Sequence, residues 1–317
     1  MVSSVTRAST APFLGVALLG MLLFASSAGA AEFFIQTSNV DHAWIVKRLG
    51  GDLIETYTPH KGFQEPELTW VDEVFPSWII RAKRANGYVR YGLYADVWAN
   101  TLIDASGNPR IKPGAAGYLD PTGDFEILEI PTGPVDRRMG DLHVFGNPHY
   151  LLDPANAVPV AKKTAEWLIH LMPKHKAEIE ANLKSFLDEL AAKMKQWDER
   201  AAPLRGKNLV SYHRTWSYLA KRWGIHVVGV IEPKPGIEPT VRDVEVLIAA
   251  MKANPAPVII KVPVYSDKWP KYVADRVGYP VRIRTLGAHV GGAEGINTYF
   301  ELFDYLIDNL LDLYGLK

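Results

Sequence analysis

The feature that most constrains the fold is one uninterrupted helical pattern in the middle of the chain. Residues Lys174–Ala202 contain no glycine or proline and are rich in alanine, glutamate, lysine and leucine, which are strong helix formers. Apolar residues recur there at spacings of three and four, which gives one apolar face over many turns. At about 1.5 Å per residue, a single helix here is roughly 40 Å long, so we expect a stiff connector between two halves of the chain. The apolar face consists of Ile179, Leu183, Phe186, Leu187, Leu190, Met194 and Trp197.

Strand-like and helix-like patterns alternate on both sides of this connector. Before it, strands are predicted at Phe33–Thr37, Asp52–Thr58, Tyr88–Tyr91 and Glu126–Ile130, and helices around Asp41–Leu49, Leu68–Ala85 and Ala95–Asp104. After it, strands are predicted at Asn208–His213, His226–Val230, Val258–Val264 and Val281–Thr285, and helices near Trp216–Trp223, Val241–Ala253, Lys268–Val277 and Thr298–Leu313. This alternation predicts an α/β protein with a parallel sheet in each half. The alternative, one large sheet with the long helix as a crossover, is disfavoured by the helix length.

The first thirty residues have the features of a secretory signal peptide. Arg7 is their single charge, an apolar stretch runs from Pro12 to Ala25, and Ala28-Gly29-Ala30 has the small-x-small pattern that signal peptidase recognises. The uncharged stretch is shorter than the roughly 20 residues of a membrane-spanning helix. We therefore expect a signal peptide at 1–30, an N-terminal lobe at 31–173, the connecting helix at 174–202 and a C-terminal lobe at 203–317.

Composition limits the compartment and the partners. The chain contains no cysteine, so we expect neither a lipid anchor nor a disulfide framework, and a freely soluble periplasmic protein fits this pattern best. Without residues 1–30 the chain has 34 Lys+Arg against 35 Asp+Glu. This balance gives no electrostatic reason to expect nucleic acid or an anionic membrane surface as a partner.

Histidines follow several of the predicted strands. His60 comes after Asp52–Thr58, His213 ends Asn208–His213, and His149 lies in the loop before a helix at Ala155. Ligands of open parallel α/β sheets bind at the carboxyl ends of the strands, so histidines placed there can converge although they are far apart in sequence. His289, after the last predicted strand, is a fourth candidate. The pattern predicts a metal site.

Four sequence blocks resemble the metal-binding substrate-binding proteins of ABC importers, the zinc and manganese receptors, and the resemblance covers essentially all of residues 32–317. It implies two (β/α)4 lobes with parallel sheets, one long connecting helix, and a metal site in the cleft between the lobes. It further implies that His60, His149 and His213 bind the metal. The blocks are Thr58-Pro59-His60 with Glu65-Pro66, Gly146–Pro154 ending in Leu-Asp-Pro, Tyr212–Tyr218, and Glu232–Thr240.

The ligand types favour zinc. Imidazole suits Zn, Cu, Ni and Fe, whereas Mn sites favour carboxylate oxygens, and the manganese and iron receptors of the resembled family generally have a carboxylate where His213 stands. Copper and nickel stay open on ligand chemistry alone. For the fourth ligand we expect His289, because no carboxylate occurs in Arg282–Ala288; water or Glu65 is the alternative. His143, six residues before His149, is expected to be an accessory contact.

These observations predict a monomeric periplasmic solute-binding protein that is not an enzyme. It is expected to capture Zn²⁺, or Mn²⁺ or another divalent metal, and to deliver it to an ABC permease in the inner membrane. A manganese or iron receptor of the same family is the first alternative. A zinc hydrolase with Glu65 or Glu238 as general base ranks lower, because the chain has no His-Glu-x-x-His motif. A binding or adhesion module with a structural metal is the third.

Export of the chain gives the first testable prediction. Cleavage after Ala30 should leave a mature protein that begins Ala31-Glu32-Phe33, because the apolar stretch and the Ala28-Gly29-Ala30 pattern place the peptidase there. Intact-mass measurement of the protein from the periplasmic fraction checks this. Recovery of the uncleaved chain from the membrane fraction would instead favour an N-terminal anchor.

Overall fold

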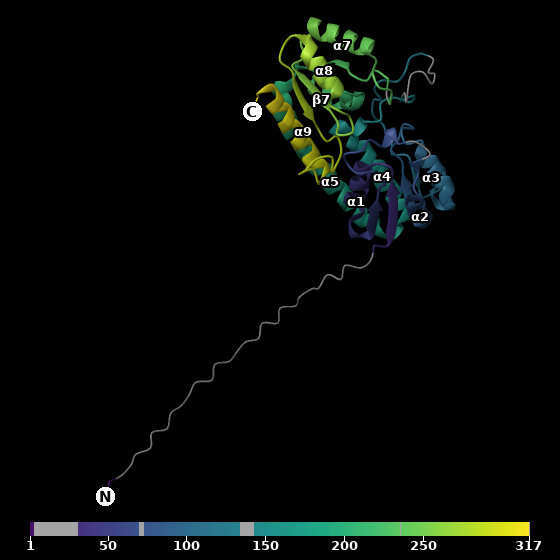
Figure 1. Cartoon of the computed structure of the whole chain (residues 1–317). Coiled ribbons are helices and arrows are strands. Elements are labelled where there is room, and N and C mark those ends of the chain that lie inside the picture. Colours follow the sequence, from purple (N-terminus) through teal and green to yellow (C-terminus); the bar gives the residue numbers. More distant parts are fainter. Residues whose placement is uncertain (3–30, 70–72, 134–142, 235, 317) are drawn as a thin grey trace. The chain divides into compact units, whose positions relative to one another are not determined.

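Two parallel four-stranded sheets form the framework of this protein (Figure 1), seen in a computed structural model that describes residues 1–2, 31–69, 73–133, 143–234 and 236–316. We call the part built on the first sheet the N-terminal lobe and the part built on the second the C-terminal lobe. The N-terminal strands are β1 Phe33–Thr37, β2 Ile54–Tyr57, β3 Gly87–Val89 and β4 Tyr118–Leu119. The C-terminal strands are β5 Asn208–Ser211, β6 His226–Val230, β7 Val258–Lys261 and β8 Arg282–Thr285.

Both sheets have the same strand order. It is β2-β1-β3-β4 in the first sheet and β6-β5-β7-β8 in the second, and all pairs are parallel. The first strand of each sheet therefore lies between the second and the third, so the chain reverses its direction of progress across the sheet there. Ligands of open α/β sheets bind at such a switch point, beyond the carboxyl ends of the strands. The prediction of an α/β fold with two parallel sheets is confirmed.

The connecting helix is α5, Lys176–Ala201. Figure 1 shows it beside α1 and α9, and it contacts α1 and α4 of the N-terminal lobe and α9 of the C-terminal lobe. Its fully buried residues are spaced by seven and four, as expected for one face of a helix. One core cluster continues through α5 into both lobes. The buried residues of α5 are Ile179, Phe186, Leu190, Trp197 and Ala201.

The other helices follow the alternation expected from the sequence. In α1, the side chain of Asn39 caps the helix by accepting from the backbone N–H groups of Asp41 and His42. The helices of the N-terminal lobe are α1 Val40–Gly50, α2 Pro76–Arg84, α3 Trp98–Ser106 and α4 Ala157–Leu171. Those of the C-terminal lobe are α6 Ser217–Trp223, α7 Val241–Ala253, α8 Lys268–Val277 and α9 Tyr299–Tyr314.

The predicted strand Glu126–Ile130 is wrong. The fourth strand of the first sheet is Tyr118–Leu119, and residues 126–130 have no strand structure. The backbone N–H of Leu128 donates to the Tyr218 hydroxyl at 3.0 Å, and its carbonyl accepts from the Asn147 N–H at 2.8 Å. These groups therefore bond to a side chain and a loop rather than to a neighbouring strand.

Two predicted helices start too early. The helix predicted at Leu68–Ala85 begins at Pro76, a residue favoured in the first turn because it lacks an N–H, and residues 70–72 of the predicted range lie outside the described residues. The helix predicted at Ala95–Asp104 begins at Trp98. The predicted signal peptide also lies outside the described residues, apart from residues 1–2.

Residues 31–317 form one compact unit by their contacts, so the predicted lobe boundaries at residues 173 and 203 stay predictions. Among the described residues, no helix combines the length and the apolar character that a membrane crossing requires.

A buried ion pair follows β3. The guanidinium of Arg90 donates to both carboxylate oxygens of Asp96 at 2.9 Å, the backbone N–H of Tyr91 donates to the same carboxylate at 2.9 Å, and both charged side chains are almost fully buried. This pair fixes the segment between β3 and α3, at the switch point of the first sheet.

Removal of one partner of this pair should be costly. Asp96→Ala leaves the Arg90 charge buried without its partner, so we expect the free energy of unfolding to fall by about 3–5 kcal/mol, measured by urea denaturation. Asp52→Ala is the matched control, because Asp52 is fully exposed and pairs with the half-exposed Lys47, and such surface pairs contribute about 0–1 kcal/mol. Equal effects of the two changes would contradict the prediction.

Candidate metal centre

One carboxylate and three imidazoles gather where the two lobes meet. Glu67, His143, His149 and His213 each offer a ligand atom, and these atoms all lie within 4.8 Å of one another. Glu67 belongs to the short 3-10 helix η2, Pro66–Leu68, which follows β2, and His213 follows β5. His143 and His149 lie in the loop before α4. The ring centroids of the three histidines form a triangle with sides of 5.5, 5.5 and 5.8 Å.

Five buried atoms of this group have no hydrogen-bond partner among the described residues. They are both carboxylate oxygens of Glu67 and the Nε2 atoms of the three histidines. The Nε2 of His149 lies 3.3 Å from a Glu67 oxygen without forming a hydrogen bond. Buried polar atoms are almost always paired in folded proteins, and unpaired ones are expensive. Five such atoms around one point are the arrangement that a cation would satisfy.

The imidazole of His213 is oriented by Glu232, which follows β6. Its Nδ1 lies 3.1 Å from a Glu232 carboxylate oxygen, which only accepts, so Nδ1 is the donor. A neutral ring that donates from Nδ1 has its lone pair on Nε2, the atom that faces the group. Glu232 is in turn held by the backbone N–H of Gly236 at 3.1 Å. A carboxylate behind the histidine is the usual second layer of a metal site.

The segment that carries His149 is tied to the segment that carries His213 through Asn147. The Asn147 amide nitrogen donates to the Arg214 carbonyl at 2.8 Å, and its amide oxygen accepts from the His149 N–H at 2.9 Å. Gly146 has a φ of 102°, and a Cβ there would lie 2.2 Å from the Ile127 side chain. The chain can therefore turn at this point only with glycine. Asn147 fixes two ligand-bearing segments relative to each other.

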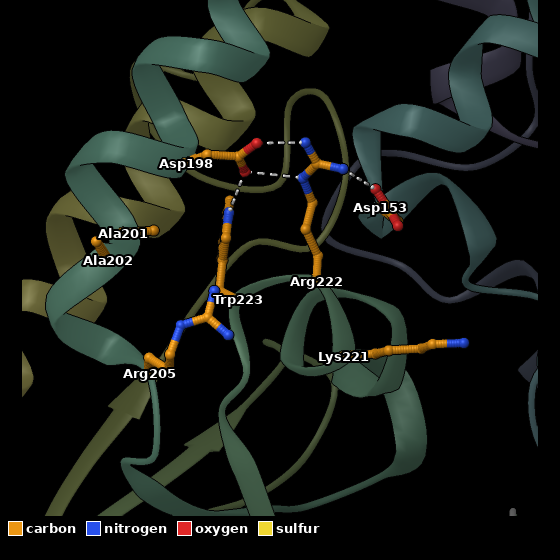
Figure 2. Close-up of a pocket in the computed structure, with 8 residues that line it drawn as sticks. All are labelled: Asp153, Asp198, Ala201, Ala202, Arg205, Lys221, Arg222 and Trp223. Carbon is orange, nitrogen blue, oxygen red and sulfur yellow. Dashed lines mark hydrogen bonds and ion pairs between the residues drawn. The ribbon is translucent and has the colours of Figure 1, made fainter.

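The Leu-Asp-Pro end of the same block is anchored by Arg222 of α6. Figure 2 shows the Arg222 guanidinium between Asp153 and Asp198 of α5, and it donates to them at 3.1 and 2.8 Å respectively. Asp153 also caps the following turn by accepting from the Ala155 N–H. A cavity of about 360 Å³ lies beside this ion pair, and its lining shares no residue with the metal-facing group. Asp153 is thus an anchor between the lobes and lies outside the metal-facing group.

Burial sets the protonation of the group. Burial, together with the neighbouring His213, lowers the pKa of His143 to about 3 and brings the pKa of His149 well below its usual value. Burial and the nearby Glu65 carboxylate raise the pKa of Glu67 well above its usual value. At His143 and His149 the site therefore presents neutral imidazoles with free lone pairs, and at Glu67 a carboxyl group whose negative charge a bound cation would stabilise.

The structure brings two of the four predicted histidines, His149 and His213, into this group and leaves His60 outside it. The Nε2 of His60 lies 2.7 Å from the Thr69 hydroxyl, and its ring packs on Trp98 and Trp78 at centroid distances of 5.0 and 5.5 Å. Burial lowers the pKa of His60 to about 4, so the ring is neutral.

His289 also lies outside the group, although it is close to it. Its ring nitrogens face Asp41 at 2.6 Å and Glu65 at 3.3 Å. Glu65, His149 and His289 offer ligand atoms within 4.8 Å of one another, so this second cluster shares His149 with the first. In this second cluster, Glu65 and His289 already bond to each other, whereas the five metal-facing atoms of the first group have no hydrogen-bond partner among the described residues.

Sequence reasoning missed Glu67 and gave His143 only an accessory place. Glu65 and Glu67 flank Pro66, and the sequence cannot say which of them faces the histidines, because the 3-10 turn at Pro66–Leu68 decides it. The available signal for His143 was its position six residues before His149 in the same loop.

Comparisons with known proteins identify the family of this chain. A family model described as zinc-uptake complex component A, periplasmic, matches residues 35–313, and the chain belongs to this family of metal-binding substrate-binding proteins of ABC importers. The family consists of transport proteins and not of enzymes. The chain is 26% identical over 168 residues to the high-affinity zinc uptake system protein ZnuA of Brucella abortus, covering 52% of this chain.

Two further similarities concern a lipoprotein and a solved structure. The chain is 24% identical over 179 residues to the zinc-binding lipoprotein AdcA of Streptococcus pneumoniae, covering 56% of this chain. The matches span 49% of ZnuA and 35% of AdcA, so the chain matches half or less of these relatives' length. A crystal structure of ZnuA has the same fold, with a TM-score of 0.72, 22% identity, and coverage of 89% of this chain and 98% of that one.

The metals of similar proteins differ. An iron-binding protein of Yersinia pestis is 25% identical over 188 residues, covering 57% of this chain and 60% of its own length. A periplasmic metal-binding protein of Candidatus Liberibacter asiaticus, solved with manganese, has the same fold, with a TM-score of 0.70, 15% identity, and coverage of 88% of this chain and 98% of that one. The metals that the names of these relatives give are therefore zinc, iron and manganese.

Proposed function

We propose that this protein captures Zn²⁺ with Glu67, His143, His149 and His213 and delivers it to an ABC permease in the inner membrane. The observation that carries the proposal is the set of five buried, unpaired nitrogen and oxygen atoms that face one another. Three imidazole nitrogens and one carboxylate oxygen are a common ligand set for tetrahedral zinc. The bound ion is cargo, and no bond chemistry takes place at the site.

Several features support a closed binding site over a hydrolytic one. Catalytic zinc usually keeps three protein ligands and an open position for water, whereas four side chains converge here. Glu232 bonds to the ring of His213, as second-layer groups of metal sites do, and Asn147 accepts from the backbone N–H of His149 and so fixes the chain that carries this ring.

Zinc fits these ligands better than manganese or iron does. Nitrogen donors outnumber oxygen donors three to one, and Mn²⁺ favours carboxylate, carbonyl and water oxygens. Divalent iron stands below zinc in the usual order of affinities for such ligands, so an iron receptor is the alternative that the ligand set favours less. The proposal includes export through residues 1–30 and a soluble, monomeric periplasmic receptor without a lipid anchor.

Zinc should stabilise the folded receptor through these four residues. A ligand that binds only the folded state stabilises it by about 4 kcal/mol at a thousandfold excess over its Kd, so saturating Zn²⁺ should raise the melting temperature. Alanine at Glu67, His143, His149 or His213 should remove most of this increase, measured by differential scanning calorimetry. His226→Ala, on an exposed histidine, is the control.

The same experiment compares the two possible histidine sets. His60→Ala should keep most of the zinc-dependent increase, because its Nε2 bonds to Thr69. If His60→Ala loses the increase and His143→Ala keeps it, the ligand set proposed here is wrong.

The balance of nitrogen and oxygen donors should set the metal preference. His143→Asp replaces one imidazole by a second carboxylate, so the ratio of Zn²⁺ to Mn²⁺ affinity should fall relative to the wild-type protein. Calorimetric titration of both proteins with each metal measures this ratio. His143→Ala separates the loss of a ligand from the gain of an oxygen donor, and an unchanged ratio in His143→Asp would place His143 outside the ligand set.

A further inference from the structure

His289 lies between two carboxylates of the N-terminal lobe. Its Nδ1 is 2.6 Å from the Asp41 carboxylate and its Nε2 is 3.3 Å from the Glu65 carboxylate. The next backbone N–H, that of Val290, donates to the other oxygen of Asp41 at 2.8 Å. The side chains of His289, Asp41 and Glu65 are all at least 96% buried. A loop that follows β8 of the C-terminal lobe is therefore bonded to α1 and to the segment after β2.

This geometry leaves His289 without a lone pair for a metal. Carboxylate oxygens accept hydrogen bonds, so both ring nitrogens of His289 act as donors and the ring is an imidazolium. Burial opposes this charge, but the Asp41 and Glu65 carboxylates outweigh it and raise the pKa of His289 well above its usual value. A metal ion in the cluster of Glu65, His149 and His289 would have to displace these bonds.

The backbone around Gly62 is in close contact with the same loop. A Cβ at Gly62 would lie 2.0 Å from the Val290 carbonyl oxygen, 2.4 Å from the Gly291 carbonyl carbon and 2.6 Å from the Gly292 nitrogen. Real Cβ atoms do not approach backbone this closely, so the two segments can meet only with glycine at position 62. The contact is made by atoms that no rotamer change can move away.

The bond of His289 to Glu65 and the backbone contact at Gly62 both affect the position of Glu67. Glu65 is separated from Glu67 by Pro66 alone, whose ring fixes φ, and the Pro66 carbonyl accepts from the Trp98 indole N–H at 2.9 Å. A displacement of Glu65 or of the Gly62 segment would therefore be transmitted to Glu67 through a stiff turn.

We propose that His289 is a positioning residue that fixes the Gly62–Glu67 segment against the C-terminal lobe and thereby places Glu67 at the metal. It is not itself a metal ligand. This inference rests on the proposed metal site, of which Glu67 is a member, and it assigns His289 a role different from the fourth ligand expected from the sequence.

The first test separates positioning from ligation. In His289→Gln and His289→Ala, zinc affinity measured by chelator competition should fall about 10–100-fold, as for other groups that orient metal ligands. The visible absorption spectrum of the Co²⁺-loaded variants should keep the position and intensity of the wild-type spectrum, because the four donor atoms are unchanged. His213→Ala, which removes a ligand, should change that spectrum, and His226→Gln should alter neither quantity.

The second test disturbs the contact without changing any polar group. Gly62→Ala should weaken zinc binding with an unchanged Co²⁺ spectrum, and its effect should not add to that of His289→Gln, because both act on the same segment. Gly133→Ala is the matched control, since a Cβ there meets nothing within 4 Å. Wild-type zinc affinity in Gly62→Ala, or additive effects of the two changes, would overturn the inference.

A third measurement detects the ring protons of His289 in the wild-type protein. In the ¹⁵N spectrum of histidine-labelled wild-type protein, the signals of the His289 ring are assigned by their absence from the spectrum of His289→Gln. These signals should show protons on both ring nitrogens with and without zinc. Loss of a ring proton on zinc binding would make His289 a ligand and overturn the inference, as would a Co²⁺ spectrum of His289→Gln that matches that of His213→Ala. Failure of the wild-type protein to bind either metal would instead refute the proposed function, and the ring protons of His289 would still be measurable.

Discussion

The rest of this structure depends on a cluster of buried polar atoms that the protein's own groups leave without hydrogen-bond partners. Three imidazole nitrogens and two carboxylate oxygens are buried together at the junction of the lobes, and none of these atoms has a hydrogen-bond partner among the described residues. In the absence of an ion, this arrangement lowers stability, because desolvated polar atoms normally require partners. Under the proposed function, the same unpaired atoms supply the difference in free energy between the empty and the zinc-bound protein.

Such a site works only if the surrounding chain prevents its side chains from finding other partners. The helix α5 packs against α1, α4 and α9, so a continuous core links the two sheets beside the metal-facing group. Around the site, Glu232 holds His213, while Asn147 joins the His149 segment to the Arg214 carbonyl. Arg222 joins Asp153 to Asp198 in the same way. Each of these contacts bridges segments that are distant in sequence, so rigid packing rather than local structure places the side chains of the metal-facing group.

The sequence was a good guide to features that depend on local patterns. The connecting helix, seven of the eight strands and the positions of His149 and His213 follow from periodicity, strand ends and sequence blocks. It failed where tertiary contacts decide. The apolar residues around Leu128 have the pattern of a strand, but the backbone of Leu128 bonds to the Tyr218 hydroxyl and to the Asn147 N–H. The sequence pattern could not choose between Glu65 and Glu67, and it could not show that Thr69 occupies the Nε2 of His60.

The contrast between His149 and His289 shows what turns a histidine into a potential ligand. Both rings are buried to the same degree, and burial alone disfavours the charged form of each. His149 has other imidazoles around it, which disfavour its charge further and leave it neutral with a lone pair. His289 has a carboxylate on each side, which binds both of its ring protons. Two nearby histidines therefore differ in role, since His149 offers a lone pair and His289 offers two protons. The neighbouring hydrogen-bond acceptors, rather than the histidine itself, determine which role each ring takes.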